Sequence, residues 1–379
     1  MKILIVGGSL QGVEVAYLAH HAGWETLLID KHPHVAAAQM CHRFIELDVT
    51  DQSKWQSCIR DIKDIDLVVP ATENAAALAA LHQWSLTSAI PFAFDAATYA
   101  ISSSKLRSDH LFAELGVPAP KPWPNCSFPV IAKPESSSGS RGVRLFNDRP
   151  QLEEFFSSFS ASLPPPGWVI QEYVEGPSYS LEVMGTPGNY IPLQVTDLDM
   201  DDSYDCKRVS APTLLSPTQV KQFEKISLHI AQSIQLRGIM DVEIILHDNQ
   251  LKVLEIDARF PSQTPTAVFQ SSGWNMMPLL AQCFTSQKVI KAADQKRGAI
   301  YQHIEVSPRG IRISGEHIMS EVGPLFLCHD FFGADEAITN YSPSAYSWVA
   351  TLIIEATDLQ SAQQKSDRVI QNIRQSIIR

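Results

Sequence analysis

The sequence predicts an α/β protein, α+β overall, with an N-terminal parallel βαβ domain, a larger central domain and a small C-terminal α+β lobe. Short apolar strands alternate with helical segments over the first 100 residues, which is typical of a parallel sheet covered by helices. Two β-branched segments, 239–246 and 251–256, flank a polar turn and predict a β-hairpin. Strands at 299–306 and 348–355 and a closing helix at 362–378 predict the last lobe. We therefore expect domains over residues 1–100, 101–287 and 288–379.

The composition excludes several classes of protein. The 379 residues carry a net charge of −11 without a local Lys/Arg cluster, which argues against a nucleic-acid partner. Six scattered cysteines without a C-x-x-C pair fit reduced thiols better than disulfides or a zinc site. No apolar run approaches the roughly 18 residues that span a bilayer. We expect a cytoplasmic protein without a membrane partner.

The N-terminal domain places polar residues at the ends of its predicted strands. Strand 2–6 leads into the loop Gly7–Gly12 and a helix at 13–21, strand 26–29 ends at Asp30, and strand 66–69 is followed by Glu73 and a helix at 75–84. The glycine-rich loop leaves N–H groups free for an anion, and the shared strand ends should bring Gln11 and Glu73 together. The alternative for Glu73 is a solvated acid at a helix start. The spacing to Asp30 also fits a dinucleotide fold, although G-G-x-x-x-G departs from G-x-G-x-x-G.

A lysine and a flexible loop follow each other in the central domain. A helix that starts near Ser102 ends at Gly116, and strand 130–133 ends at Lys133, shortly before the Ser/Gly-rich loop Glu135–Gly142. Backbone N–H groups of small residues can cradle phosphate oxygens, and the lysine supplies a point charge. The alternative is a mobile hairpin tip.

Two further segments add polar candidates. Strand 178–184, which follows strand 168–173, carries Ser180 and Glu182 on one face. The acidic stretch 197–205 has no apolar periodicity, and we expect a solvated loop in preference to a lid whose acids bind ammonium groups. Tyr204 and Asp205 are the exceptions that we place near a ligand. An amphipathic helix at 217–236 then leads into the hairpin.

The hairpin carries four acids with a spacing of two. Asp241 and Glu243 lie on the first strand and Glu255 and Asp257 on the second, so each pair points to one face. A five-residue turn would set Glu243 opposite Glu255 and Asp241 opposite Asp257. Facing carboxylates repel unless a cation lies between them, and an oxygen-seeking ion such as Mg²⁺ suits them. Arg259 follows one pleat further on. The alternative is a solvated acidic face.

The order of these elements resembles the ATP-grasp superfamily from residue 1 to about residue 284. Within it, several segments are similar to the 3-methyl-D-ornithine–L-lysine ligase family of pyrrolysine biosynthesis. These segments are LQG at 10–12, ESSS at 135–138, QEYVEG at 171–176, DSYDC at 202–206, GIMDVE at 238–243, EIDARFPSQTPTAV at 255–268 and SSG at 271–273. The resemblance implies an ATP-grasp architecture with a Rossmann-like pre-ATP-grasp domain at the N-terminus.

The resemblance also implies roles for individual residues. ATP would contact Lys105, Lys133, the loop residues Ser138, Gly139 and Ser140, and the adenine-side residues Glu172, Tyr173 and Val174. Two Mg²⁺ ions would bind Glu243, Glu255 and Asp257, the last of which stands where many ATP-grasp members have Asn. Arg259 and Lys133 would be catalytic, acting on the transferred phosphoryl group. The substrates would contact Leu10, Gln11, Glu73, Ser180, Glu182, Tyr204, Asp205, Ser262 and Thr264, with Glu73 and Asp205 as candidate bases.

The activity implied by the resemblance is an ATP-dependent amide ligation. The carboxylate of (3R)-3-methyl-D-ornithine would become an acyl phosphate, and the ε-amine of L-lysine would displace the phosphate. The expected assembly is a homodimer. Two alternatives remain at this point: another ATP-grasp carboxylate-amine ligase, and a nicotinamide-dependent oxidoreductase that uses the N-terminal βαβ unit. A metal-binding hairpin has no function in the second alternative.

Overall fold

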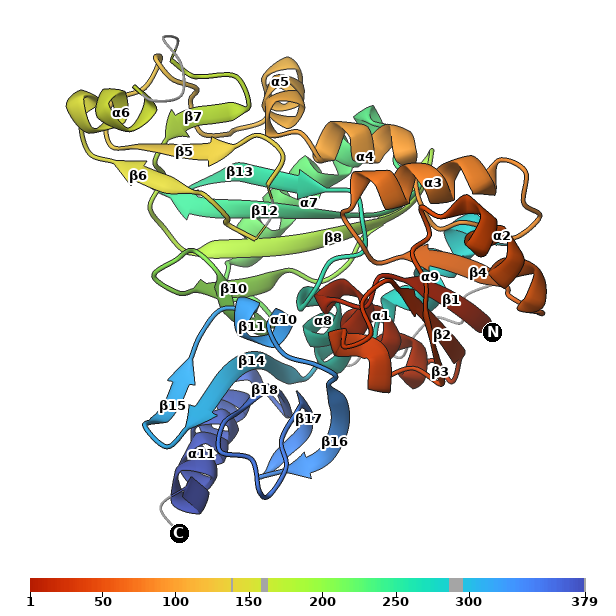
Figure 1. Cartoon of the computed structure of the whole chain (residues 1–379). Coiled ribbons are helices and arrows are strands. Elements are labelled where there is room, and N and C mark those ends of the chain that lie inside the picture. Colours follow the sequence, from red (N-terminus) through yellow and green to blue (C-terminus); the bar gives the residue numbers. More distant parts are fainter. Residues whose placement is uncertain (138, 158–162, 286–295, 378–379) are drawn as a thin grey trace.

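The computed structural model describes residues 1–137, 139–157, 163–285 and 296–377 (Figure 1). These residues form a four-stranded parallel sheet, an eleven-stranded sheet and a three-stranded sheet. The predicted fold class is confirmed, with a parallel N-terminal sheet followed by antiparallel ones. None of the helices that the structure describes combines the length and apolarity needed to cross a bilayer.

The N-terminal domain is a parallel sheet with strand order β3-β2-β1-β4. Its elements are β1 (Lys2–Val6), α1 (Leu10–His21), β2 (Glu25–Asp30), the short helix η1 (Ala36–Gln39), β3 (Arg43–Glu46), α2 (Gln52–Asp61), β4 (Leu67–Pro70) and α3 (Ala75–Ser85). The sequence interpretation did not include β3, because its four residues are only partly buried and show little apolar alternation. Gly7, at the end of β1, has φ of +108°, and a Cβ there would lie 2.2 Å from the carbonyl oxygen of Ala71. A glycine therefore lets the loop before α1 lie directly against the end of β4.

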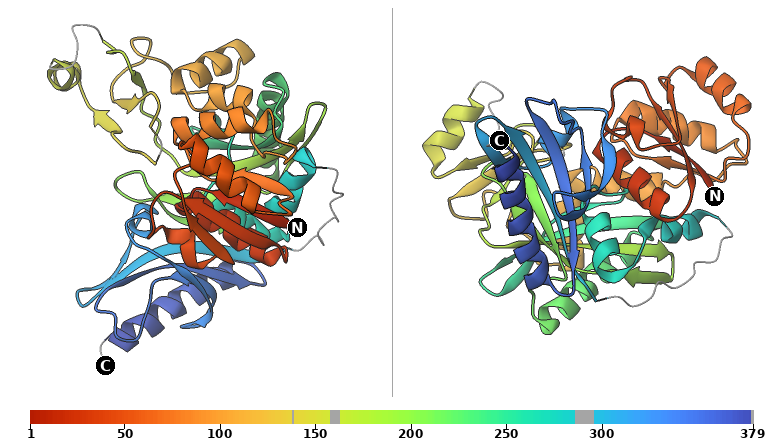
Figure 2. Two further views of the ribbon diagram at one scale, coloured as in Figure 1. Left: turned by 45° about the vertical axis from the view of Figure 1, so that its right-hand side comes forward. Right: turned by 90° about the horizontal axis from the view of Figure 1, so that it is seen from below.

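The three-stranded sheet is a separate small unit. It has the order β6-β5-β7 and is preceded by two helices. The bounds are α4 (Ala96–Ser102), α5 (Lys105–Leu115), β5 (Val130–Pro134), β6 (Arg144–Phe146), α6 (Arg149–Phe156) and β7 (Trp168–Glu172). Gly116 ends α5 in a left-handed conformation, as the sequence predicts. Figure 2 shows this sheet projecting from the rest of the molecule, beyond one edge of the large sheet.

The large sheet begins with the central part of the chain. Its elements there are β8 (Ser178–Thr186), β9 (Asn189–Pro192), β10 (Thr196–Met200), β11 (Cys206–Ala211), α7 (Pro217–Ser233), β12 (Gly238–His247), β13 (Gln250–Asp257), α8 (Thr264–Ser272) and α9 (Met276–Phe284). The expectation of a solvated loop over 197–205 is wrong for its first half. Leu198 is buried in β10 between β8 and β11, while the side chain of Asp197 accepts hydrogen bonds from Thr213 and from the backbone of Leu214.

The C-terminal lobe extends the same sheet. Strand β11 pairs with β14, which pairs with β18, so the sheet runs on through β17 to β16. The elements are β14 (Gly298–Ser307), β15 (Gly310–Ile313), α10 (His317–Ser320), β16 (Phe326–Phe331), β17 (Ala334–Thr339), β18 (Trp348–Ala356) and α11 (Leu359–Ile377). Helix α11 lies along this part of the sheet (Figure 2). Its buried face includes Val369 and Ile373, which join the core cluster of the lobe.

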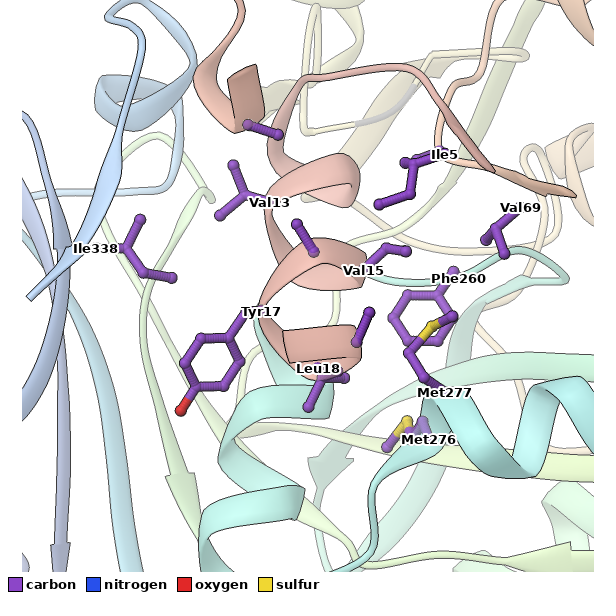
Figure 3. Close-up of a cluster of buried hydrophobic side chains, with 14 of the residues drawn as sticks. Ile5, Val13, Val15, Tyr17, Leu18, Val69, Phe260, Met276, Met277 and Ile338 are labelled. Carbon is purple, nitrogen blue, oxygen red and sulfur yellow. The ribbon is translucent and has the colours of Figure 1, made fainter. Parts of the chain in front are cut away.

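Helix α1 lies in the core where the N-terminal domain meets the rest of the chain. Its residues from Gln11 to Ala19 are buried without a break. Figure 3 shows Val13 and Tyr17 on the side of Ile338 from the C-terminal lobe, while Phe260 and Met277 lie on the other side of the helix. A helix that is buried all round fixes the position of the glycine-rich loop from which it starts.

A carboxylate is buried within this contact. Glu14 of α1 is fully buried, and its Oε1 accepts the backbone N–H of Thr266 in α8 at 2.5 Å. The Tyr301 hydroxyl lies 3.5 Å from Oε2. Burial raises the pKa of Glu14 from 4.5 to about 7, since its hydrogen bonds offset only part of the desolvation.

We expect Glu14 to make stability depend on pH. Because its folded pKa is raised, the stabilisation from its protonated form is complete below about pH 4.5 and is lost as pH rises through 7. Glu14→Gln should remove this dependence. Relative to the parent protein, the free energy of unfolding of the variant should be about 2–3 kcal/mol larger at pH 8 than at pH 5. Urea unfolding at both pH values measures the gain. Glu46→Gln, at an exposed position of β3, is the control. An equal effect of Glu14→Gln at both pH values would contradict the prediction.

Candidate active site

The hairpin β12–β13 has the predicted register. Asp241 lies opposite Asp257, and Glu243 lies opposite Glu255. The predicted five-residue turn is wrong, however. Pairing continues to the ends of both strands, where Asp248 and Asn249 form a two-residue turn with φ of +47° and +61°, and a register shift follows Glu243. Asp and Asn tolerate this conformation, so the tight turn and the shift together give the expected pairing.

The acidic face extends to the neighbouring strand. In β8, Glu182 lies opposite Asp241, and Ser180 lies opposite Glu243 and donates a hydrogen bond to Asp241. Glu182 is completely buried, and neither oxygen of its carboxylate has a hydrogen-bond partner among the described residues. The hairpin acids therefore adjoin a fifth carboxylate.

The electrostatics of this face favour a bound cation. Burial raises the pKa of Glu243 well above its ordinary value, and the nearby Asp241 and Glu255 raise it further. Burial also raises the pKa of Glu182 to about 8, of Asp257 to about 7 and of Asp241 to about 6. Oδ1 of Asp257 is buried without a partner. These carboxylates are costly to ionise unless a cation lies near them. Their oxygen atoms suit a divalent ion such as Mg²⁺ as ligands.

Arg259 connects this face to the N-terminal domain. Its Nε lies 2.7 Å from Oδ2 of Asp257, and its guanidinium also forms an ion pair with Glu73, which follows β4. Gln11 of α1 reaches the same Glu73 carboxylate, with Nε2 3.4 Å from Oε1. The predicted meeting of Gln11 and Glu73 is thus confirmed, and both lie beside the hairpin.

Two lysines approach the acidic face from the other side. Lys105, at the start of α5, lies 3.3 Å from Glu255 and donates to the carbonyl oxygen of Ser137 at 2.6 Å. Burial lowers the pKa of Lys133, at the end of β5, although Glu255 opposes this effect. Both ammonium groups therefore lie between the Ser/Gly loop and the acids.

Three pockets open around these charges and share residues. The inter-sheet pocket lies between the small and large sheets and is lined by residues including Lys105, Lys133, Tyr173, Met200 and Glu255. The acidic pocket is lined by residues including Asp241, Glu243, Asp257, Arg259 and Thr264. The glycine-loop pocket is lined by residues including Gly7, Leu10, Gln11, Glu73 and Arg141. The acidic pocket shares Glu243 and Glu255 with the inter-sheet pocket. It shares Arg259 and Ser262 with the glycine-loop pocket, so the three pockets form one continuous trough.

Most of the residues predicted from sequence line this trough. The inter-sheet pocket holds Lys105, Lys133, Gly139, Ser140, Glu172, Tyr173 and Val174. The acidic pocket holds Tyr204, Asp205, Glu243, Glu255, Asp257, Arg259, Ser262 and Thr264, and the glycine-loop pocket holds Leu10, Gln11 and Glu73. The carboxylate of Glu172 pairs with Lys252 at 2.9 Å. Ser180 and Glu182 are buried beside Asp241 and line none of the three pockets, and Ser138 lies outside the described residues.

The C-terminal lobe adds residues that sequence reasoning missed. Glu316, His317 and Ser320 line the glycine-loop pocket, and Glu316 also lines the acidic pocket. No motif in residues 299–379 points to a site in the sequence, yet the fold brings these three side chains to the pockets. Glu316 follows the short strand β15, and no local pattern around it signals a site. Its place depends on the long-range pairing of β11 with β14.

The dinucleotide interpretation of the first loop is not favoured by the geometry. Asp30 would have to bind a ribose hydroxyl in that interpretation. Its Oδ2 instead accepts the N–H of Gly8 at 2.8 Å, and its Oδ1 accepts the N–H of His32 at 2.9 Å. Both oxygens of Asp30 are therefore engaged by backbone N–H groups, one in the glycine-rich loop and one in the segment just after β2.

Comparisons with known proteins agree with this geometry. A model of the ATP-grasp domain matches residues 102–263. The chain is 38% identical to a 3-methyl-D-ornithine–L-lysine ligase of Methanosarcina mazei, over 84% of this chain and 82% of that relative. It is 36% identical to the ligase of the same name from Methanosarcina barkeri, over 84% of each chain.

Solved structures share the fold at low sequence identity. The biotin carboxylase domain of a Hydrogenobacter thermophilus 2-oxoglutarate carboxylase, in complex with MgADP, has a TM-score of 0.72 and 15% identity, covering 96% of this chain and 88% of that one. An ADP complex of N5-carboxyaminoimidazole ribonucleotide synthetase has a TM-score of 0.71 and 13% identity, covering 99% and 97%.

We expect Glu243→Gln to separate the stability of the acidic face from its metal binding. Removing one of the mutually repelling carboxylates should raise the melting temperature of the metal-free protein by roughly 1–2 °C for each kcal/mol gained. Mg²⁺ should raise the melting temperature of the parent protein and have little effect on the variant. Differential scanning calorimetry with and without Mg²⁺ measures both changes. Asp248→Asn, at the exposed turn of the same hairpin, is the control. A variant that is still stabilised by Mg²⁺ would show that the ion binds elsewhere.

Proposed function

The chain belongs to the 3-methyl-D-ornithine–L-lysine ligase family of ATP-grasp enzymes, and we propose that it performs the ligation that names this family. It is an ATP-dependent carboxylate-amine ligase. The proposed substrates are (3R)-3-methyl-D-ornithine, through its carboxylate, and L-lysine, through its ε-amine. The product would be an intermediate of pyrrolysine biosynthesis.

The observation that carries the proposal is the position of the acidic hairpin between two differently built pockets. On one side, Lys105 and Lys133 line a pocket between the small and large sheets. On the other side, Glu73 and Gln11 line a pocket that reaches the hairpin through Arg259. A nucleotide and an amine can thus approach the same carboxylate from opposite directions, as an ATP-dependent ligation requires.

The first half of the reaction activates a carboxylate. Expelling oxide from a carboxylate is prohibitive, so one of its oxygens attacks the γ-phosphate of ATP, which gives an acyl phosphate and ADP. Lys133 and Arg259 stabilise the charge that develops on the transferred phosphoryl group. Glu243, Glu255 and Asp257 would hold Mg²⁺, which neutralises phosphate charge when bound. The partly buried carboxylates of these residues, with Lys105 beside Glu255, fit that ion.

The two amino acids are assigned by charge. We place L-lysine in the glycine-loop pocket beside Leu10, Gln11 and Glu73, whose carboxylate can attract an ammonium group. We place 3-methyl-D-ornithine by the acidic pocket near Ser262 and Thr264, with Ser180 and Glu182 beneath. The carboxylate of Glu182 has no partner among the described residues, which suits an ammonium ligand.

A contact across the trough can exclude water from the acyl phosphate. Ser140, in the loop after β5, donates a hydrogen bond of 2.7 Å to the carbonyl oxygen of Tyr204 in the turn after β10. The loop and the turn therefore meet above the pockets, and this position suits a cover for a reactive intermediate.

The proposal also includes the number of metal ions, the location of the enzyme and its assembly. Two Mg²⁺ ions are proposed because Glu243, Glu255 and Asp257 offer more oxygens than one ion needs when phosphate oxygens also bind it. We also propose that the enzyme is cytoplasmic and works as a homodimer, and analytical ultracentrifugation tests the assembly.

The test is to measure ADP release with Mg²⁺-ATP, D-ornithine and L-lysine, added singly and together. D-ornithine stands in for its methylated form. We expect ADP release to need both amino acids and mass spectrometry to find a product lighter than their sum by one water. Glu255→Gln should lower turnover by at least 10²-fold, because it removes a metal ligand beside the phosphoryl group. The control is Asp248→Asn. ATP consumption that depends on a different acid or amine would keep the ligase class and overturn the substrate assignment.

A further inference from the structure

Glu316 lies where two parts of the trough meet. It precedes α10, and Oε2 of its carboxylate accepts hydrogen bonds from Ser262 Oγ at 2.9 Å and Gln263 Nε2 at 2.7 Å. Gln263 has φ of +72°, so these bonds hold an unusual turn at the start of α8. Oε1 of Glu316 accepts no hydrogen bond from any residue in the described part of the chain. One oxygen of this carboxylate is therefore uncommitted.

The position of Glu316 is between the two proposed substrates. It lines both the acidic pocket and the glycine-loop pocket, together with Arg259 and Ser262. Glu316 is therefore one of the residues at which the two pockets meet, within reach of an amine in the second pocket and an acyl group in the first.

We propose that Glu316 accepts the proton that the ammonium group of the second substrate must lose before it attacks the acyl phosphate. This role rests on the proposed function, because it concerns the amine that the ligation consumes. It gives the C-terminal lobe a part in the chemistry, through a residue distant in sequence from the hairpin.

Glu73 and Asp205, the two carboxylates that the sequence suggested as bases, are more fully engaged by cationic or imidazole groups. Glu73 forms an ion pair with Arg259 and is also contacted by Gln11. Asp205 accepts both the backbone N–H and, at 2.5 Å, the Nδ1 of His317 on the same oxygen. Glu316 is held by a neutral hydroxyl and a neutral amide. Neutral donors compensate less of its charge, so its free oxygen remains the better proton acceptor.

The surroundings of Glu316 also favour protonation. Burial raises the pKa of Glu316, and the nearby carboxylate of Asp205 raises it further, while the hydrogen bonds and Arg259 lower it. Glu14 lies close enough for its own pKa to be raised by Glu316. His317, directly after it, pairs with Asp205.

The ε-ammonium gives one proton to Glu316 and becomes a neutral amine. The amine nitrogen forms a C–N bond to the acyl carbon while the bond from that carbon to the phosphate oxygen breaks. The second proton of the nitrogen leaves with the phosphate, which departs as hydrogen phosphate, and Glu316 then releases its proton to solvent.

The need for such an acceptor follows from the basicity of lysine. With an unperturbed pKa near 10.4, only about one free ε-amine in 10³ is neutral at pH 7.5. A positioned general base contributes typically 10²–10⁴-fold, which offsets this shortage. A nucleophile that is already neutral does not need the base.

The test compares two nucleophiles in Glu316→Gln. The amide oxygen of Gln can still accept from Ser262 and Gln263, which preserves the turn. We expect the variant to lose about 10²-fold or more in L-lysine-dependent product formation. Hydroxylamine, which is largely uncharged at neutral pH, should still trap the acyl phosphate as a hydroxamate at close to the parental rate. The deficit with L-lysine should also narrow as pH rises toward the pKa of its amine.

The controls separate this role from simpler ones. Glu305→Gln removes a surface carboxylate of the same lobe that pairs with Arg312, and it should leave both reactions unchanged. An equal loss with both nucleophiles in Glu316→Gln would show a structural role and overturn the proposal. A selective loss in Asp205→Asn instead would assign the proton to Asp205. Hydroxamate formation by a parent protein that never uses L-lysine would overturn the lysine assignment itself, and this role with it.

Discussion

The constraint on which the site depends is the burial of several carboxylates on one face of a β-sheet. Charges that lose water are costly unless opposite charges replace it. Here Lys105 and Lys133 lie near Glu255 at one end of the face, and Arg259 pairs with Asp257 at the other. The same electrostatic requirement therefore brings the start of α5 and the end of β5 to the hairpin, and Arg259 extends the charge pairing to Glu73 of the N-terminal domain.

This arrangement divides the work between rigid and adjustable parts. The acids sit on neighbouring, hydrogen-bonded strands, so their mutual spacing is set by the sheet. Lys133 belongs to a small sheet that pairs with no strand of the large one in the described residues, whereas Lys105 lies on α5, which packs against β13 of the large sheet. The N-terminal domain is held by the fully packed helix α1. The small sheet can thus shift against the acids, which keep their positions in the large sheet.

Sequence reasoning succeeded where the chemistry is local. The spacing of two along each strand places Asp241 and Glu243, or Glu255 and Asp257, on one face whatever the rest of the chain does. The predicted pairing of the acids was right although the predicted turn length was wrong. A two-residue turn combined with a register shift brings the same residues opposite each other as a five-residue turn would. Local reasoning failed where a residue is placed by distant partners. Asp197 and Asp199 were predicted to lie in a solvated loop, yet they belong to a strand that pairs with β8 and β11. Glu316 enters the site only through the pairing of β11 with β14.

The unbroken sheet has a consequence for dividing this protein into parts. Strand β11 is an interior strand only because β14 covers its outer edge. Cutting the chain before β14 would leave the N–H and C=O groups of β11 exposed as a template on which other chains can pair, which is a known route to aggregation. The C-terminal lobe therefore cannot be removed without exposing a sheet edge. Chimaeras that exchange the N-terminal domain should keep residues 298–356 with the hairpin.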